Sequence, residues 1–401
     1  MRILVHDYAG HPFQVQLSRA LAARGHDVHH AFSTTNLTPH GVLRRLPQDP
    51  AGFDPIGIDQ TTIDKGAQSV GGLVARRNAE AEYGGRVAQH LRMFEPDVVL
   101  SANTPLDAEA HILRVAKETN VRFVKWLQDV ISVGTTRLLG KRMFGMGRAA
   151  GKYYESMERK QLLAADHIVA ITEDFVSHLT GWGVDEGKIT VIENWAPLQD
   201  LPVRPDVNVW SHHHGLSGKR VFLYAGTLGM KHNPELLAML AERFAQPGFE
   251  DVRVVVVSEG PGADYLAQAK AERDLKRLVL LPFQPFEEMP NMLGTATVLL
   301  ALLEQEAATF SVPSKVLTAM CARRPILLSV PPENLVARIV ERERAGVVVD
   351  PLDNAAFVEA AVDLLKLDHE RLAMGERARA YAERTFNIDR ITHRFEEVLI
   401  G

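Results

Sequence analysis

Short, nearly continuous runs of valine, isoleucine and leucine recur along the chain, and helical periodicity follows most of them. Strands that are buried on both faces have this composition, and helices between them cover the two faces of a parallel sheet. The runs in the first half are RILVHDY, HDVHHAF, DVVLSAN, RFVKWLQ, HIVAIT and KITVIEN. Those in the second half are RVFLYAG, VRVVVVS, LVLLPF, TVLLALL, PILLSV and GVVVD. The pattern therefore predicts an α/β protein with two doubly wound, Rossmann-like domains.

A polar, proline-rich segment, WAPLQDLPVRPDVNVWSHHHGLSGK (195–219), separates the two halves and is interpreted as a linker. The 401 residues are enough for two domains of about 200 residues each. We expect residues 1–197 to form the first domain, residues 198–375 the second, and helices at 376–401 to cross back onto the first. Because ligands of doubly wound sheets bind beyond the carboxyl ends of the strands, the expected site is a cleft between the domains.

Composition and charge exclude several classes of protein. The net charge of −5 argues against a general nucleic-acid binder. His6 and Asp7 interrupt the N-terminal apolar run, which favours a strand over a signal peptide, and no run reaches the roughly 20 residues of a membrane helix. Cys321 is the only cysteine, which excludes an internal disulfide, and we expect its thiol to be buried and inert. A cytoplasmic protein is expected, soluble or peripherally attached to a membrane.

One segment mixes basic and large apolar residues. No acid occurs between Asp129 and Glu155, where Arg137, Lys141, Arg142, Arg148 and Lys152 lie among leucine, methionine and phenylalanine. Such a mixture suits an anionic membrane surface or lipid headgroup. Glycines weaken any continuous helix here, so a solvated helix with a glycine-rich loop is the alternative. We interpret residues 137–152 as a peripheral contact with the inner face of the plasma membrane.

Two stretches of the second half are suited to bind an anion. In YAGTLGMKHNPELL (224–237), glycines let backbone amides approach a ligand, a helix start favours anions, and Lys231 adds a positive charge. In SVPSKVLTAM (311–320), Ser314 can cap a second helix start whose amides remain unpaired, and Lys315 adds charge. Either stretch alone is also typical of an ordinary strand–turn–helix junction. Because both follow strands of one parallel sheet, together they indicate a diphosphate site.

These stretches belong to an ordered set with VVVVSEGPG, LVLLPFQPFEEMPNMLGTATVLLALL, VPSKVLTAMCARRPILLSV and ERAGVVVDP. The set resembles the donor-binding half of the GT-B glycosyltransferases, and within them the retaining family 4. Its PSK-L-T-x-M variant is similar to the branch that builds bacterial exopolysaccharides and surface glycans. In the first half, GHPFQVQLSRALAARGHDV and VIENWAP resemble the family's opening and closing elements. The resemblance covers essentially the whole chain and implies two Rossmann-like domains that face an interdomain cleft.

The resemblance implies a retaining hexosyltransferase. Its donor would be a UDP- or GDP-sugar held by the second domain, and its acceptor a glycan or polyprenyl-diphosphate-linked glycan held by the first. The nucleotide-sugar is a substrate, and neither a cofactor nor a metal ion is expected. Two alternatives stay open. A nucleotide-sugar 2-epimerase of the same fold would convert the donor without an acceptor, and a non-catalytic glycan-assembly partner would bind nucleotide without transfer.

The family's motifs also imply the residues of the site. The donor contacts are Gly226, Thr227, Gly229, Lys231, Glu259, Gly260, Pro282, Phe283, Gln284, Ser314, Lys315 and Thr318. The acceptor-side residues are Gly10, His11 and Gln128. Catalytic roles fall to Lys231, which would stabilise the leaving diphosphate, to Asp129, which would orient the acceptor hydroxyl or act as an auxiliary base, and to Glu306.

The chain departs from the family at two places. Thr318 stands where the family usually has the second of two glutamates. The first glutamate maps near Phe310, so three polar neighbours are candidates for its contact with the donor sugar, with Glu306 preferred: Glu304, Glu306 and Thr309. Gln128 stands where a histidine often precedes Asp129. These departures affect the identity of the sugar and the first-domain contacts rather than the fold.

Overall fold

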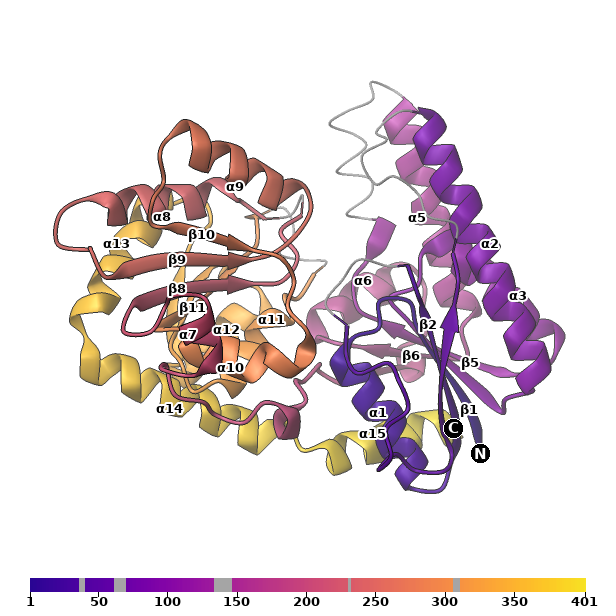
Figure 1. Ribbon diagram of the computed structural model, residues 1–401. Coiled ribbons are helices and arrows are strands. Elements are labelled where there is room, and N and C mark those ends of the chain that lie inside the picture. Colours follow the sequence, from indigo (N-terminus) through magenta and orange to yellow (C-terminus); the bar gives the residue numbers. More distant parts are fainter. Residues whose placement is uncertain (36–39, 61–69, 133–145, 230–231, 306–310) are drawn as a thin grey trace. The chain divides into compact units, whose positions relative to one another are not determined.

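The computed structural model describes residues 1–35, 40–60, 70–132, 146–229, 232–305 and 311–401 (Figure 1). The chain divides into two compact units. Unit 1 comprises Met1–Glu193 together with Ile388–Gly401, and unit 2 comprises Asn194–Asn387. Each unit contains one parallel sheet with helices packed on it. The predicted fold class, a pair of doubly wound, Rossmann-like domains, is therefore confirmed.

The sheet of unit 1 has seven parallel strands in the order β3-β2-β1-β4-β5-β6-β7 within the described residues. The strands are β1 (Arg2–Asp7), β2 (Asp27–Ser33), β3 (Phe53–Ile58), β4 (Val98–Ala102), β5 (Arg122–Leu127), β6 (His167–Ala170) and β7 (Ile189–Val191). The direction of winding reverses between β1 and β4, and the carboxyl edge at such a reversal is where doubly wound sheets generally bind their ligands.

The strand β3 is the one strand of this sheet that the apolar runs did not predict. Its sequence FDPIGI contains Pro55 and Gly57, which interrupt an apolar pattern. Among the described residues, the strand lies at the edge of the sheet and pairs with β2. Proline has no N–H to donate to a strand ladder, so an edge is where a sheet tolerates it.

The helices of unit 1 are α1 (Pro12–Ala23), α2 (Val70–Phe94), α3 (Leu106–Glu118), α5 (Met146–Ala164), α6 (Val176–Gly181) and α15 (Ile388–Ile400), with 3₁₀ turns η1 (Glu173–Phe175) and η2 (Glu186–Lys188). Helices α2 and α3 pack closely (Figure 1). A Cβ at Gly84 would lie 2.4 Å from the carbonyl oxygen of Ala108, so only glycine allows this approach. Helix α15 packs on α1, and the Phe395 ring lies 4.7 Å from that of Trp126. The chain's last helix thus completes the core of unit 1.

The sheet of unit 2 has six parallel strands in the order β10-β9-β8-β11-β12-β13 within the described residues. They are β8 (Arg220–Ala225), β9 (Val252–Val257), β10 (Leu278–Leu281), β11 (Val298–Leu302), β12 (Ile326–Ser329) and β13 (Gly346–Val349). The helices are α7 (Val209–His213), α8 (Glu235–Ala245), α9 (Pro261–Glu272), α10 (Met289–Thr295), α11 (Lys315–Cys321), α12 (Leu335–Glu343), α13 (Asn354–Lys366) and α14 (Asp368–Thr385), with η3 (Leu198–Asp200) and η4 (Phe286–Glu288). Here the winding reverses between β8 and β11.

The segment 195–219, interpreted as a linker, is an ordered part of unit 2. Trp195 and Trp210 are buried, with 1% and 3% exposure. A capping box between Asn208 and Ser211 begins the short helix α7, which packs on α10. The polar, proline-rich composition suggested a linker, but the buried side chains of Trp195 and Trp210 anchor the segment in unit 2. Cys321 is buried as predicted, and burial raises the pKa of its thiol to about 12.

Candidate active site

The predicted donor contacts of unit 2 follow four neighbouring strands. Gly226 follows β8, Glu259 follows β9, Pro282 follows β10, and Glu304 follows β11. These strands are adjacent and parallel, so their carboxyl ends share one edge of the sheet (Figure 1). The edge includes the reversal between β8 and β11, where a doubly wound sheet binds its ligands.

The loop after β8 has a defined conformation. Gly226 has φ +124°, which only glycine adopts readily, and its amide donates to the Val257 carbonyl at 3.0 Å. The Tyr224 hydroxyl donates to the Thr227 carbonyl at 2.8 Å. The Gly229 amide donates to Nδ1 of His232 at 2.9 Å. The glycine turn is therefore held in place by the neighbouring strand β9 and by two buried rings.

Lys315 from α11 lies on this loop. Its ammonium group donates to the Thr227 carbonyl at 3.1 Å and to the Tyr224 hydroxyl, and it sits 4.0 Å from the centroid of the Tyr224 ring. A Cβ added to Gly226 would lie 3.4 Å from Cε of Lys315. The structure thus brings a cation from one predicted anion-binding stretch onto the glycine turn of the other. Tyr224, which the sequence did not single out, contacts both groups, because its hydroxyl bonds to the Thr227 carbonyl and to the Lys315 ammonium group.

The first turn of α11 differs from the expected free helix start. Ser314 has helical dihedral angles, φ −56° and ψ −22°, and its side chain makes no capping hydrogen bond. The amide of Val316 donates to the Pro313 carbonyl at 3.1 Å, and that of Leu317 donates to the Ser314 carbonyl at 3.0 Å. These amides are therefore used within the turn, and the expectation that Ser314 caps it is wrong. Thr318 lies within the helix and is half-buried.

The loops after β9 and β10 are joined to each other. A Glu259 carboxylate oxygen accepts a hydrogen bond from the Phe283 amide at 3.1 Å. The Gln284 side chain accepts from the Trp210 indole at 3.1 Å and donates to the Pro282 carbonyl at 2.9 Å. Gly260, with φ +92°, follows and leads into α9. These predicted contacts therefore form one connected rim beside the β8 loop.

Several predicted residues lie outside the described part of the chain. They include Lys231 and Glu306, two of the three predicted catalytic residues, as well as Thr309 and Phe310. Glu304 is described, follows β11 and is half-buried. Most of the basic segment 137–152 is also outside, although Lys152 is exposed on α5. The roles assigned to these residues stay predictions.

On unit 1, the predicted acceptor-side residues Gly10 and His11 lie between β1 and α1. Gly10 is buried with φ +71°, and a Cβ there would lie 2.7 Å from Cδ1 of Leu43. The His11 ring stacks on that of Phe13, with centroids 5.7 Å apart. Burial, together with the charge of His40, lowers the pKa of His11 to about 4. His11 is therefore a neutral imidazole at neutral pH, able both to donate and to accept one hydrogen bond.

Gln128 and Asp129 follow β5 at the same edge of the unit 1 sheet; Gln128 is buried and Asp129 half-buried. Just beyond them, the buried Glu158 of α5 accepts hydrogen bonds from the amides of Ile131 and Ser132, both at 2.9 Å. By accepting these two hydrogen bonds, Glu158 stabilises the backbone conformation of the segment that follows β5. The sequence offered no signal for this contact, because Glu158 looks like any charged residue of an amphipathic helix.

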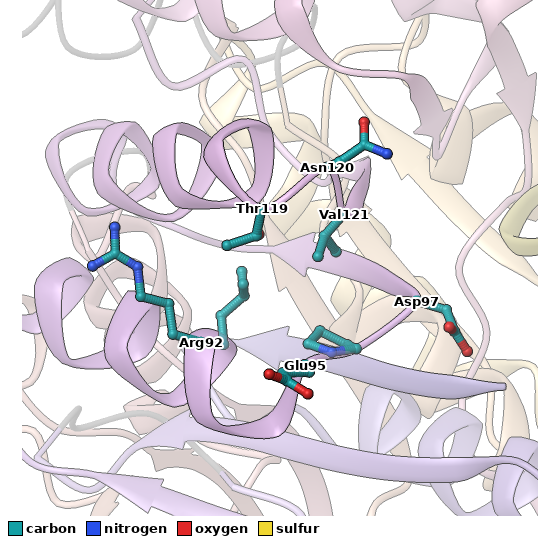
Figure 2. A pocket seen from close by; sticks show the side chains of 8 residues that line it. Arg92, Glu95, Asp97, Thr119, Asn120 and Val121 are labelled. Atoms are coloured by element: carbon teal, nitrogen blue, oxygen red, sulfur yellow. The ribbon is translucent and has the colours of Figure 1, made fainter.

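A cavity of about 430 Å³ lies at the amino edge of the unit 1 sheet, opposite the carboxyl edge that carries Gly10, His11 and Gln128 (Figure 2). It is lined by Leu91, Arg92, Glu95, Pro96, Asp97, Thr119, Asn120 and Val121, where α2 and α3 end and where β4 and β5 begin. None of these is a predicted site residue, and the cavity is not part of the candidate site.

Neither a metal-binding cluster nor a membrane-spanning helix occurs in the described part of the chain. In residues 1–35, 40–60, 70–132, 146–229, 232–305 and 311–401, no group of three histidine, cysteine, aspartate or glutamate side chains is arranged to hold a metal ion. Across the same ranges, no helix is both long enough and apolar enough to span a bilayer.

The class of enzyme to which these two Rossmann-like units belong is identified by comparison with known protein families. The chain is a glycosyltransferase with the GT-B fold. Residues 11–195 match the family described as "Glycosyl transferase 4-like domain", and residues 219–367 match "Glycosyl transferases group 1". The resemblance to family-4-like GT-B enzymes found in the sequence is therefore confirmed.

Individual relatives are distant but cover much of the chain. WcaI of Escherichia coli (strain K12), named provisionally as a colanic acid biosynthesis glycosyl transferase, is 22% identical over 308 residues, which are 76% of this chain and 74% of WcaI. Anabaena HepE in complex with UDP and glucose superimposes with a TM-score of 0.73 at 15% identity, covering 100% of both chains. WaaG, a glycosyltransferase involved in lipopolysaccharide biosynthesis, gives a TM-score of 0.71 at 15% identity, also covering 100% of both chains.

Proposed function

We propose that the chain transfers a hexose, with retention of configuration, from a UDP- or GDP-sugar to a glycan or polyprenyl-diphosphate-linked acceptor. The observation that carries the proposal is the contact between Lys315 and the Gly226–Thr227 turn at the switch point of unit 2. A glycine turn that a ligand can approach closely and a preplaced ammonium group suit a diphosphate. HepE, of the same fold, is described in complex with UDP, which supports a uridine nucleotide.

The reaction needs a leaving diphosphate whose negative charge is stabilised as the glycosidic bond to phosphate breaks. In our proposal, Lys315 beside the β8 turn faces that charge, and Lys231 assists from its place in the YAGTLGMK stretch. The acceptor hydroxyl attacks the anomeric carbon on the face that the phosphate leaves. Its proton passes to the departing phosphate oxygen, so no protein nucleophile is required, and Asp129 orients the hydroxyl.

The acceptor and the location belong to the same proposal. WcaI and WaaG are named for colanic acid and lipopolysaccharide biosynthesis, and this supports a surface-glycan acceptor. The basic segment 137–152 would hold the enzyme at the inner face of the plasma membrane, where a polyprenyl-linked acceptor is presented.

Lys315 offers a direct test. Nucleotide-sugars are first screened by thermal shift, and transfer to lipid-extract acceptors is then measured by mass spectrometry. We expect Lys315→Met, which keeps the side-chain length but removes the charge, to lower kcat by about a hundredfold. The matched control is Lys276→Met, because Lys276 is 78% exposed in the same unit and pairs only with its neighbour Asp274 in the described contacts.

Three results would go against the proposal. Near-normal transfer by Lys315→Met removes the assigned phosphate role. Conversion of the sugar nucleotide in the absence of any acceptor identifies a 2-epimerase. Nucleotide binding without transfer to any acceptor identifies a non-catalytic assembly partner.

A further inference from the structure

The last residue of β1 is a buried acid that the proposed reaction does not use. Asp7 is 0% exposed, and it lies at the switch point of unit 1. Its carboxylate accepts hydrogen bonds from the amides of Ala9 at 3.1 Å and His11 at 2.5 Å. With the Gln14 amide nitrogen turned toward it, Gln14 donates to both carboxylate oxygens at 2.6 and 2.7 Å. A buried acid is tolerated where donors surround it in this way.

The same carboxylate connects two loops. In that orientation, the Gln14 side-chain oxygen accepts a hydrogen bond from Nδ2 of Asn103 at 3.2 Å. Asn103 directly follows β4 and has φ +52°, an uncommon conformation for a residue other than glycine. The loops after β1 and β4 lie on either side of the point where the winding of the unit 1 sheet reverses. Asp7 and Gln14 therefore connect and order these two loops.

This arrangement leaves no place for a phosphate at the start of α1. In nucleotide-binding Rossmann units, the amides between the first strand and the first helix receive the ligand's phosphate. Here the amides of Ala9 and His11 are directed at Asp7 instead. An incoming phosphate would find its donors occupied and would meet a group that can itself carry negative charge. The neutral imidazole of His11, by contrast, can exchange hydrogen bonds with a hydroxyl group.

We propose that Asp7 is a positioning residue of the acceptor side, a buried carboxyl group that occupies the first helix start and holds the Gly10–His11 turn for an uncharged, hydroxyl-bearing part of the acceptor. The inference rests on the proposed function, because that function assigns the acceptor to unit 1. It means that the acceptor's sugar, and not its diphosphate, lies against this turn.

The test compares Asp7→Ala with Asp166→Ala. Asp166 accepts a hydrogen bond from the Phe123 amide at 2.8 Å at the amino edge of the same sheet, so it controls for loss of a carboxylate–amide contact. We expect Asp7→Ala to raise the acceptor KM by about tenfold while the donor KM stays the same. Added formate, a small anion that fits the vacated space, should restore the acceptor KM of Asp7→Ala and leave Asp166→Ala unchanged. The proposal would be overturned if Asp7→Ala raised the donor KM as much as the acceptor KM, or if formate did not restore the acceptor KM.

A second readout needs no turnover. Hydrogen–deuterium exchange of the resting protein should be faster in residues 8–14 of Asp7→Ala, and formate should slow it again. If Asp7→Ala does not fold, the isosteric Asp7→Asn replaces it, since its NH₂ would face the same amide donors. Unchanged exchange in residues 8–14 would overturn the positioning role whatever the activity. If exchange responds as expected but the wild-type chain transfers no sugar, the proposed function fails and the ordering role of Asp7 stands.

Discussion

The two sheets treat the loop at their switch point in opposite ways. In unit 1, β1 ends in Asp7, and the following turn donates its amides to that buried carboxylate. In unit 2, β8 ends in the half-buried Ala225, and the ammonium group of Lys315 lies on the following turn. Both turns contain a glycine with positive φ, Gly10 and Gly226. The backbone scheme is shared, whereas the charge placed beside it is reversed.

The difference shows how two copies of one architecture can take unlike ligands. A strand–turn–helix junction with spare amides attracts an anion whichever sheet it belongs to. An internal carboxylate satisfies the junction of unit 1, and a cation strengthens that of unit 2. Local charge, more than topology, therefore decides which unit receives the diphosphate in our account.

The largest effect is expected from a charge placed on the unit 2 turn. Thr227 is exposed, so its side chain can be replaced without disturbing the core. We expect Thr227→Asp to weaken UDP or GDP binding by about a hundredfold, because a carboxylate a few ångströms from a diphosphate near the surface is strongly repelled. Thr227→Asn has nearly the same shape and should bind within a few-fold of wild type. Isothermal titration calorimetry with UDP or GDP measures both affinities. If Thr227→Asp and Thr227→Asn bind the nucleotide equally well, the diphosphate does not bind at this turn.

An intermediate effect is expected from the two glycines. Gly226→Ala and Gly10→Ala each force alanine into a left-handed conformation, at φ +124° and +71°, at a cost of about 1–3 kcal/mol. We expect Gly226→Ala to raise the donor KM and Gly10→Ala to raise the acceptor KM, each by about tenfold. Steady-state kinetics with one substrate varied at a time separates the two. The division of roles between the units is contradicted if both variants alter the same KM.

The smallest effect is an acid sensitivity of unit 1. Burial lowers the pKa of His6 and of His30 to about 3, so both stay neutral in the folded state. Unfolding releases them to an ordinary pKa of about 6.5, so they stabilise unit 1 above that pH and cost stability as pH falls below it. Each histidine contributes a slope of about 1.4 kcal/mol per pH unit. Asp7, whose pKa burial raises to about 7, opposes this change as it takes up a proton below pH 7.

Replacing one histidine measures this slope. Glutamine cannot take up a proton. In His30→Gln, the free energy of unfolding of unit 1 should therefore fall less steeply than in wild type between pH 6.5 and pH 5, by about 1.4 kcal/mol per pH unit. Hydrogen exchange of unit 1 peptides at several denaturant concentrations gives that free energy. The same slope in both proteins would show that His30 is not held neutral.

The strands were predictable where burial on both faces imposed an apolar run, and β3 was not, because an edge strand can carry Pro55. The approach of Lys315 to the β8 turn followed from the shared edge of a parallel sheet. Asp7 and Tyr224 were not recognised as parts of a site. An acid at a strand end looks like an interruption, and a tyrosine in an apolar run looks like core. Their importance depends on which amides and which ammonium group the fold turns toward them, and no sequence pattern specifies that.

The central claim is that the nucleotide diphosphate binds the switch point of unit 2 and not that of unit 1. Hydrogen–deuterium exchange of the full chain, with and without saturating UDP or GDP, tests it most directly. We predict protection in residues 224–232 and 311–318, and unchanged exchange in residues 6–14. Protection of residues 6–14 with no change in the two unit 2 segments would contradict the account.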